Sequence, residues 1–353
     1  MLVVFTFLAC DEAKEDPKTN FKHSVPNKAK FRLEVLGGLK IVPLNGGVTI
    51  HIKPADSSLI GKEVFLSVDG DSIQVASIGQ KVEVIFKDVK LGLHDVEVKM
   101  ADGYKKSIRI EVLSNTVPNN LSYKIEKSYK HDISAYTQGL EFSEGELYEG
   151  TGLRNGESML RRVDLISGEP LSQIRLKSED FGEGITVFDN MVFQLTWQNQ
   201  IAYCYDKETF KLLDEFRYPQ GISEGWGLTH NSDNLIMSDG TNRIHFLDAS
   251  TFLEERFIDV YDNHGAVGQL NELEYIDGLI YANIYTTDKI AQIDPESGAV
   301  IGYIDMAGLL SDKDRMPGTD VLNGIAYNRS TNKIYVTGKR WPKLFEVKFI
   351  PKT

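Results

Sequence analysis

The sequence lacks several features that would assign it to a class at once. It has only two cysteines in 353 residues, Cys10 and Cys204, so a disulfide framework is excluded. The formal net charge is −12 and there is no long basic block, which argues against a nucleic-acid partner because phosphates need clustered cations. The seven histidines include no pair with metal-ligand spacing such as His-x3-His, which argues against a zinc site.

Long apolar runs are absent as well, apart from a short one at the start. "MLVVFTFLAC" is too short to span a bilayer but suits the apolar region of a signal peptide. Its end resembles a bacterial lipobox with Cys10 as the acylated residue, although Phe7 stands where leucine is usual and no Lys or Arg precedes the run. We therefore expect residues 1–10 to direct export of a lipoprotein, anchored to a bacterial membrane and facing the periplasm or cell surface. An ordinary secretory signal or a spurious apolar start is the alternative.

The next part of the chain predicts a tether and a small β domain. Residues 11–28 are charged and poor in large apolar side chains, as is typical of flexible tethers. Residues 29–113 contain short alternating segments such as "GVTIHIKP" and "VEVIFKDV", separated by turn signals. This pattern predicts an immunoglobulin-like β-sandwich. The domain has no convergent polar residues, so we expect a spacer or docking module that residues 114–122 link to the remainder.

The remaining residues, 123–353, repeat about every 45 residues. The aligned segments are "TQGLEF", "GEGITV", "GWGLTH", "LNELEY" and "LNGIAY". A turn and a second strand follow each one, and four units continue with a third strand that ends in a turn-forming aspartate. Four strands per unit predict an all-β, five-bladed β-propeller. The fifth unit has only three strands, and we expect "YKIEKSYK", before the first unit, to supply the fourth and close the ring.

Two positions of the repeat hold unlike side chains that a propeller would bring together on its axis. The residues before the aligned third position are Gln138, Glu183, Trp226, Asn271 and Asn323. The second strands end in Gly152, Trp197, Gly240, Tyr285 and Lys339. Taken alone, each tryptophan is more often core and the lysine a solvated strand end. Because the repeat independently makes these residues neighbours, we expect a small aromatic pocket with one carboxylate, one ammonium and several amides. Cys204, in the apolar "IAYCYD", is expected to be a buried thiol.

Motifs in every unit carry a family resemblance. "YTQGLEF", "LYEGTGL", "FGEGIT", "GWGL", "LNELEY" and "VTGKRWPKLFEVK", spread over residues 123–350, resemble those of the plant-type glutaminyl cyclases, which also occur in bacteria. The resemblance implies a propeller enzyme that converts the N-terminal glutamine of peptides or proteins to pyroglutamate and releases ammonia. It implies that Glu183, Lys339 and Asn271 are catalytic. Two aromatic positions depart from the family, because Tyr136 and Tyr285 stand where plant members have Phe and Trp.

The expected chemistry assigns a role to each residue. The α-amine of glutamine must attack its own carboxamide, so a site that holds the folded-back substrate gains much. Glu183, the only acid in the predicted ring, would accept a proton from the amine and give one to the departing ammonia. Lys339 and Asn271 would stabilise the negative charge on the carboxamide oxygen. The substrate-binding residues that we expect are Gln138, Trp197, Trp226, Tyr285 and Asn323.

Two other functions are compatible with a propeller. A metal-dependent, lactonase-like hydrolase would place a divalent cation among Gln138, Glu183, Asn271 and Asn323. A single carboxylate ligand is too few for a hard divalent cation, and the presence of Trp226 in the same ring also disfavours this function. A non-catalytic surface propeller that binds a peptide or glycan is the third hypothesis. We expect no catalytic metal and no required cofactor, while the resemblance allows a structural calcium for which the sequence assigns no ligands.

Overall fold

The computed structural model describes residues 29–352 and consists almost entirely of β-strands. The helices in this range are two three-residue 3-10 segments, η1 (Ser57–Leu59) and η2 (Asp312–Asp314). The all-β prediction is therefore confirmed. Within residues 29–352 no helix has the length and apolar character needed to cross a membrane. Cys10, the predicted signal peptide and the predicted tether lie outside the described residues.

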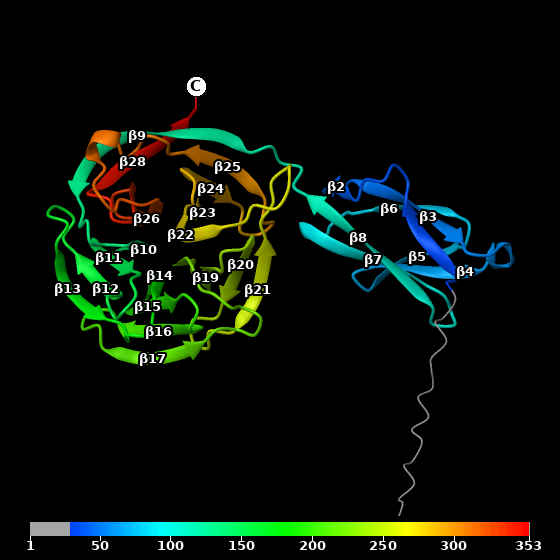
Figure 1. Ribbon diagram of the computed structural model, residues 1–353, viewed down its shortest axis with the longest axis horizontal. Helices are drawn as coiled ribbons and strands as arrows, with labels where there is room; N and C mark the ends of the chain where they lie inside the picture. Colours follow the sequence, from blue (N-terminus) through cyan, green and yellow to red (C-terminus); the bar gives the residue numbers. More distant parts are fainter. Residues whose placement is uncertain (1–28, 353) are drawn as a thin grey trace, which may run out of the picture.

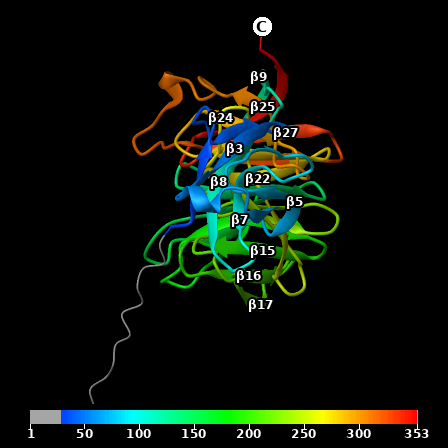
Figure 2. The same ribbon diagram turned by 90° about the vertical axis from the view of Figure 1, so that its right-hand side faces the viewer.

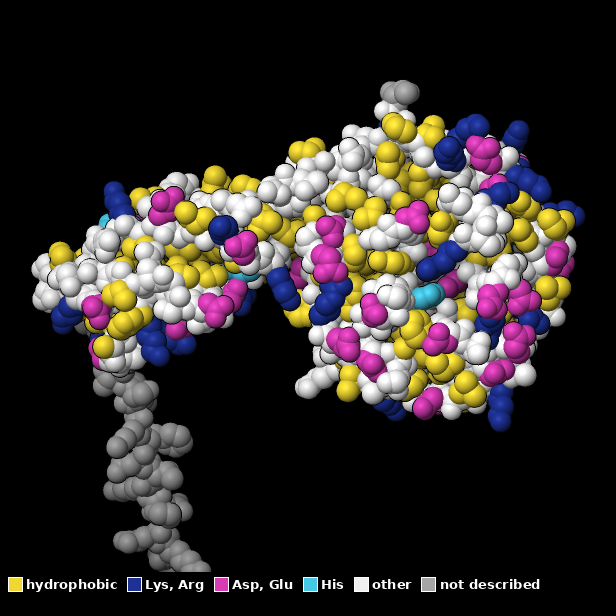
Figure 3. Space-filling model, turned by 180° about the vertical axis from the view of Figure 1, so that it is seen from behind, with side chains coloured by type: hydrophobic (Ala, Val, Ile, Leu, Met, Phe, Trp, Pro, Cys, Tyr) yellow, Lys and Arg dark blue, Asp and Glu magenta, His cyan; other side chains and the backbone are white. Residues whose placement is uncertain are grey.

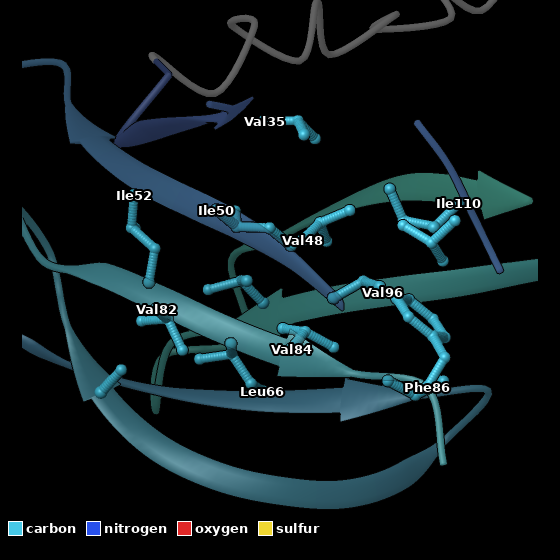
Figure 4. Packing of buried hydrophobic residues seen from close by; sticks show 14 of the residues in the cluster. Val35, Val48, Ile50, Ile52, Leu66, Val82, Val84, Phe86, Val96 and Ile110 are labelled. Atoms are coloured by element: carbon cyan, nitrogen blue, oxygen red, sulfur yellow. The ribbon is translucent and has the colours of Figure 1, made fainter. Parts of the chain in front are cut away.

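The first domain is a pair of stacked sheets with an apolar core between them (Figure 4). The sheets have the strand orders β1-β3-β6 and β2-β8-β7-β4-β5. Alternation along the strands builds the core, since Val82 and Val84 of β6 are buried whereas Lys81 and Glu83 are exposed. The strands are β1 (Phe31–Val35), β2 (Ile41–Pro43), β3 (Gly47–Pro54), β4 (Glu63–Val68), β5 (Asp71–Ser77), β6 (Lys81–Ile85), β7 (Gly92–Lys99) and β8 (Lys105–Leu113).

The rest of the chain forms a ring of antiparallel sheets around a central axis (Figure 1). Three sheets have four strands each, in chain order from the axis outward. They contain β10 (Thr137–Ser143), β11 (Glu146–Thr151), β12 (Met159–Val163) and β13 (Pro170–Arg175); β14 (Gly182–Phe188), β15 (Met191–Thr196), β16 (Ile201–Asp206) and β17 (Leu212–Arg217); and β18 (Leu228–His230), β19 (Leu235–Ser238), β20 (Arg243–Leu247) and β21 (Glu254–Asp259).

A sheet of eight strands completes the ring, in the order β22-β23-β24-β25-β9-β28-β27-β26. It therefore consists of two four-stranded units that meet at β9. The strands are β9 (Asn119–Lys130), β22 (Leu270–Ile276), β23 (Leu279–Ile284), β24 (Lys289–Ile293), β25 (Val300–Asp305), β26 (Leu322–Asn328), β27 (Lys333–Gly338) and β28 (Lys343–Pro351).

Strand β9 joins the two ends of the ring. It pairs antiparallel with β28 from Lys130 opposite Lys343 to Leu121 opposite Pro351, so the expected pairing of "YKIEKSYK" with the last unit is present. Its first residues, which lie in the segment predicted as a linker, pair in parallel with β25. The segment that precedes the first unit therefore supplies the fourth strand of the last unit and covers the edge of β28.

The repeated glycines are explained by the close approach of first strands near the axis. A Cβ atom on Gly184 would lie 2.5 Å from the backbone nitrogen of Leu228, and one on Gly227 would lie 2.0 Å from the carbonyl oxygen of Asn271. Both distances are shorter than a carbon atom tolerates, so these positions require glycine. The fourth unit has Glu272 instead, whose buried carboxylate accepts hydrogen bonds from backbone N–H groups of β10 and β26.

The sandwich lies beside the ring rather than over its centre (Figures 1 and 2). Tyr261 and Ala299 of the ring are part of the buried core cluster of the sandwich. Lys90 Nζ lies 5.0 Å from the centroid of the Phe257 ring, and the backbone N–H of Ser114 donates to the Asp262 carbonyl at 3.2 Å. The sandwich therefore packs against the outer side of the third and fourth units. Figure 3 shows acidic and basic side chains mixed over one face of both domains.

Cys204 lies in β16 and is 2% exposed, which confirms the prediction of a buried thiol. Burial raises the pKa of this thiol to about 11. Because the thiolate is the reactive form, Cys204 is unreactive at neutral pH.

Candidate active site

Seven of the eight predicted catalytic and substrate-binding residues line one cavity of about 280 Å³. It lies where the first strands of the ring converge. Two aromatic residues that the ring positions did not predict also line it. The complete lining is Tyr136, Gln138, Phe181, Glu183, Trp197, Trp226, Asn271, Tyr285 and Lys339.

Irregularities in strand pairing place the polar side chains of this cavity. The register between first and second strands shifts at the starts of β10, β14, β22 and β26. The residues without a regular partner include Gln138, Glu183, Asn271 and Asn323. A bulge twists the strand locally and turns a side chain out of the normal alternation. The same local deviation in four units therefore accounts for a polar side chain at each of these positions.

Glu183 is 5% exposed and accepts one hydrogen bond, from Gln138 Nε2 to its Oε1 at 3.0 Å. Burial raises the pKa of this carboxyl well above its ordinary value, the positive charge of Lys339 opposes the rise, and the charge of Glu224 adds to it. A raised pKa makes this carboxyl a stronger base than an ordinary glutamate, which favours its acceptance of a proton from an amine.

Lys339 follows β27 and is 3% exposed. Its Nζ lies 4.8 Å from the centroid of the Tyr136 ring and 5.1 Å from that of Tyr285, so the ammonium is held against two aromatic faces. Burial lowers the pKa of Lys339, and the carboxylates of Glu183 and Asp320 oppose this change. The cavity thus contains one acid and one base whose pKa values burial moves toward each other.

The two asparagines differ in their environment. Asn271 lines the cavity, and its Oδ1 is buried without a hydrogen-bond partner among the described residues. Asn323 is fully buried and does not line the cavity; its Nδ2 donates to the carbonyl of Thr137 at 3.0 Å and to Gln138 Oε1 at 3.4 Å. Asn323 therefore supports Gln138 from behind, which differs from the substrate contact that we expected for it.

Aromatic rings form the walls of the cavity. Trp226 and Tyr285 pack edge to face with centroids 5.4 Å apart, and Phe181 and Trp197 do so at 5.8 Å. The hydroxyl of Tyr136 donates to Asp320 Oδ2 at 3.1 Å, which holds its ring beside Lys339. Such packing keeps large side chains in one arrangement and makes the cavity largely apolar.

Tyr136 and Phe181 were missed because the ring argument counted one residue per first strand. Each precedes a predicted cavity residue by two positions, Gln138 and Glu183 respectively. Tyr136 and Phe181 precede β10 and β14, and Gln138 and Glu183 lie at register shifts, so regular strand alternation does not relate the members of each pair. The equivalent residue of the third unit, Glu224, does not line the cavity, so the two-residue spacing alone was not a sufficient signal.

Comparisons with known proteins agree with this site. The family model described as "Glutamine cyclotransferase" matches residues 99–349. The chain belongs to the glutamine cyclotransferase family. A family relative, the glutaminyl-peptide cyclotransferase of Arabidopsis thaliana, is 36% identical over 240 residues, which cover 65% of this chain and 73% of that protein. The crystal structure of Myxococcus xanthus glutaminyl cyclase matches with a TM-score of 0.62 and 33% identity, covering 67% of this chain and 100% of that one.

Membership of the glutamine cyclotransferase family weighs against the lactonase-like and the purely binding hypotheses. Within residues 29–352, no group of three or more His, Cys, Asp or Glu side chains is arranged to hold a metal ion. We derive no chemical step through a metal, and the structural calcium that the resemblance allows remains without assigned ligands.

Proposed function

We propose that the chain is a glutaminyl-peptide cyclotransferase, which converts an N-terminal glutamine of peptides or proteins to pyroglutamate and releases ammonia. The observation that carries this proposal is that Glu183 and Lys339 line one small aromatic cavity in a member of this family. The cavity volume of about 280 Å³ lies just below the roughly 300–1,000 Å³ typical of small-molecule sites. It suits one folded-back glutamine at a chain end and excludes an internal peptide segment.

Proton transfer is the task of Glu183. The α-amino group of a peptide has an ordinary pKa of about 7.7–8.0, so the arriving amine is largely protonated and cannot attack. Burial raises the pKa of the Glu183 carboxyl from its ordinary value toward the pKa of the amine. This reduces the free-energy cost of moving a proton from the amine to the carboxyl. The amine then attacks the side-chain carboxamide and forms the ring C–N bond. As the bond to the side-chain nitrogen breaks, the same carboxyl gives its proton to that nitrogen, which departs as ammonia, and takes the second proton of the ring nitrogen, which later passes to solvent.

Charge stabilisation is the task of Lys339 and Asn271. The carboxamide oxygen becomes negative when the ring closes, and donors held in a water-poor cavity stabilise it strongly. Lys339 supplies a positive charge held against two aromatic rings, and the side-chain NH2 group of Asn271, which lines the cavity, supplies N–H donors. Gln138 orients Glu183 and the substrate amine, and Trp197, Trp226 and Tyr285 enclose the glutamine side chain.

Export, anchoring and metal-independence are part of the same proposal. Cys10 would carry the lipid anchor, and the enzyme would act on peptides in the periplasm or at the bacterial cell surface. The support for this is the apolar start of the sequence and its Ala-Cys ending. Mass spectrometry of the membrane fraction, with C10S as control, would detect the acylated N-terminus.

The deciding experiment measures ammonia release from a glutaminyl dipeptide. We expect wild type to release ammonia in the presence of a chelator. We expect the kcat of E183Q to be about 10²–10⁴-fold lower than that of wild type, while its melting temperature stays within a few degrees of the wild-type value. Glu157→Gln, at an exposed position, is the control and should match wild type. Activity that survives E183Q would refute the mechanism, and activity abolished by chelation would refute metal-independence.

A further inference from the structure

The carboxylate of Glu224 holds both tryptophans of the cavity. The indole nitrogen Nε1 of Trp197 donates to Glu224 Oε2 at 2.8 Å, and Nε1 of Trp226 donates to the same oxygen at 3.0 Å. The other oxygen, Oε1, accepts from Gln198 Nε2 at 3.0 Å. Glu224 itself does not line the cavity; it is connected to the site by these contacts and by its charge, which raises the pKa of Glu183.

The two indoles come from different sheets, which makes a shared acceptor significant. Trp197 follows β15 of the second unit, and Trp226 precedes β18 of the third. Trp197 packs against Phe181, whereas Trp226 packs against Tyr285. One oxygen atom therefore fixes the positions of two walls of the cavity relative to each other, across the boundary between two units of the ring.

The backbone around Glu224 is fixed by the same neighbours. The N–H of Gly225 donates to the carbonyl of Trp197 at 3.0 Å, and a Cβ atom on Gly225 would lie 2.2 Å from the hydroxyl of Tyr218. That hydroxyl also bonds both backbone groups of Thr196, the residue before Trp197. The segment that carries Glu224 thus cannot shift without moving Trp197.

The carboxylate is ionised in this setting. Burial disfavours the charge, but the hydrogen bonds from Trp226, Gln198 and Trp197 outweigh burial and lower the pKa of Glu224. A carboxylate oxygen has lone pairs for two N–H donors, as the observed geometry uses them, and an amide oxygen has the same capacity. Without the hydrogen bond to Glu224, each indole would rotate more freely about its side-chain torsions.

We infer that Glu224 is a positioning residue for the cyclisation, which fixes the two tryptophan walls in the arrangement that holds glutamine folded back on itself. The inference depends on the proposed function, because its effect is exerted on the cyclisation step. Small displacements of groups that hold a near-attack geometry reduce intramolecular rates by large factors. We therefore expect the loss of these hydrogen bonds to lower mainly kcat.

Two conservative variants of Glu224 separate the effect of side-chain length from the effect of side-chain charge. E224Q keeps the length of the side chain and an oxygen that accepts both indole N–H groups, but removes the charge. E224D keeps the charge but is one methylene shorter, so its oxygen cannot reach both indoles. We expect E224Q to retain kcat within about threefold of wild type, and E224D to lose about 10- to 100-fold of kcat with a smaller change in KM.

Tryptophan fluorescence reports the same contacts independently of activity. The protein has three tryptophans, and the third, Trp341, is buried and donates to the Asp320 carbonyl. We expect E224D to show a shifted emission maximum and greater acrylamide quenching, and E224Q to resemble wild type. Glu179→Ala, which removes a nearby exposed charge that bonds neither indole, is the matched control for electrostatic effects.

The outcomes are distinct. If E224D retains kcat and E224Q loses it, the charge of Glu224 is what matters and the positioning role is refuted. If E224D retains wild-type kcat although its fluorescence changes, the indole contacts are structural only, and the inference is again refuted. If wild type itself releases no ammonia, the proposed function fails first and this inference fails with it, which separates the two failures.

Discussion

At the scale of single residues, the site depends on an acid and a base buried in one cavity. Burial raises the pKa of Glu183 and lowers that of Lys339, and each charge partly opposes the shift of the other. The repeat predicted that these two side chains would share a cavity, because equivalent positions in a ring converge. The cage of Tyr136 and Tyr285 rings around the ammonium was not predicted, since it depends on rotamers that packing selects.

Replacing Lys339 should affect both the rate and its pH dependence. We expect K339M to lower kcat by about 10²–10³, because the developing oxyanion loses a charged donor. The positive charge of Lys339 lowers the pKa of Glu183, so its removal raises that pKa further and moves the acidic limb of the kcat/KM profile to higher pH. The steady-state pH profile of each variant measures both effects.

The matched control is K348M, at an exposed lysine of β28. It should leave the rate and both limbs of the profile unchanged. An unchanged acidic limb in K339M would contradict the electrostatic coupling between Lys339 and Glu183.

At the scale of elements, two features build the ring and its centre. The bulges at the starts of β10, β14, β22 and β26 recur at equivalent places and turn polar side chains out of the regular alternation. The pairing of β9 with β28 joins segments about 220 residues apart in the sequence. The pairing of β9 with β28 was predictable, because the fifth unit lacked a fourth strand and the strand-like segment before the first unit had no partner of its own. The bulges were not predictable, since they depend on how each first strand pairs with the second strand of its unit.

Removing β28 should abolish the cooperative stability of the ring. Leu344, Phe345 and Val347 of this strand are 1%, 3% and 4% exposed, and burial of such side chains contributes about 1.5–3 kcal/mol each. A variant that ends at Pro342 loses these contacts and the partner of β9. Because whole proteins are stable by only about 5–15 kcal/mol, we expect no cooperative thermal transition from the ring.

Circular dichroism and calorimetry would measure this loss. A variant that ends at Pro351 keeps β28 and should melt as wild type does. A full-size cooperative transition in the shorter variant would show that the strand pair does not close the structure.

At the scale of the whole molecule, the axis carries a second set of acids. Glu141, Glu272 and Glu274 are all buried, and burial raises the pKa of each. Glu141 accepts hydrogen bonds from the Thr186 hydroxyl at 2.6 Å and the Val187 N–H at 3.1 Å, and burial raises its pKa to about 7. These carboxyls link first strands of different units, which makes the stability of the ring dependent on pH.

The sign of this dependence follows from the raised pKa. The folded state binds the Glu141 proton more tightly than the unfolded chain, so its stabilising effect is complete below about pH 4.5 and is lost as the pH rises through about 7. E141Q imitates the neutral form and removes the titration. We expect wild type to lose about 2 kcal/mol relative to E141Q between about pH 5 and pH 8. Urea unfolding at both values measures this difference, and equal pH dependence in the two proteins would contradict it.

The contact between sandwich and ring should be separable from activity. Tyr261 belongs to the ring but is buried in the core cluster of the sandwich, and it does not line the cavity. We expect Y261A to expose the linker to limited proteolysis and to split thermal unfolding into two transitions, while kcat/KM stays within about twofold. A large loss of activity in Y261A would show instead that the sandwich supports the site.

The sequence alone determined the strand content, the repeat, the residues that meet on the axis and the family to which they point, because periodicity and motif spacing are local properties of a chain. Only the tertiary structure decided which of those residues face the cavity. Asn323 occupies the predicted ring position but turns its amide to Thr137 and Gln138, and Glu224, which the ring argument did not single out, accepts hydrogen bonds from two walls of the site. Side-chain direction and shared acceptors depend on crowding between units, and no single unit of the sequence contains that information.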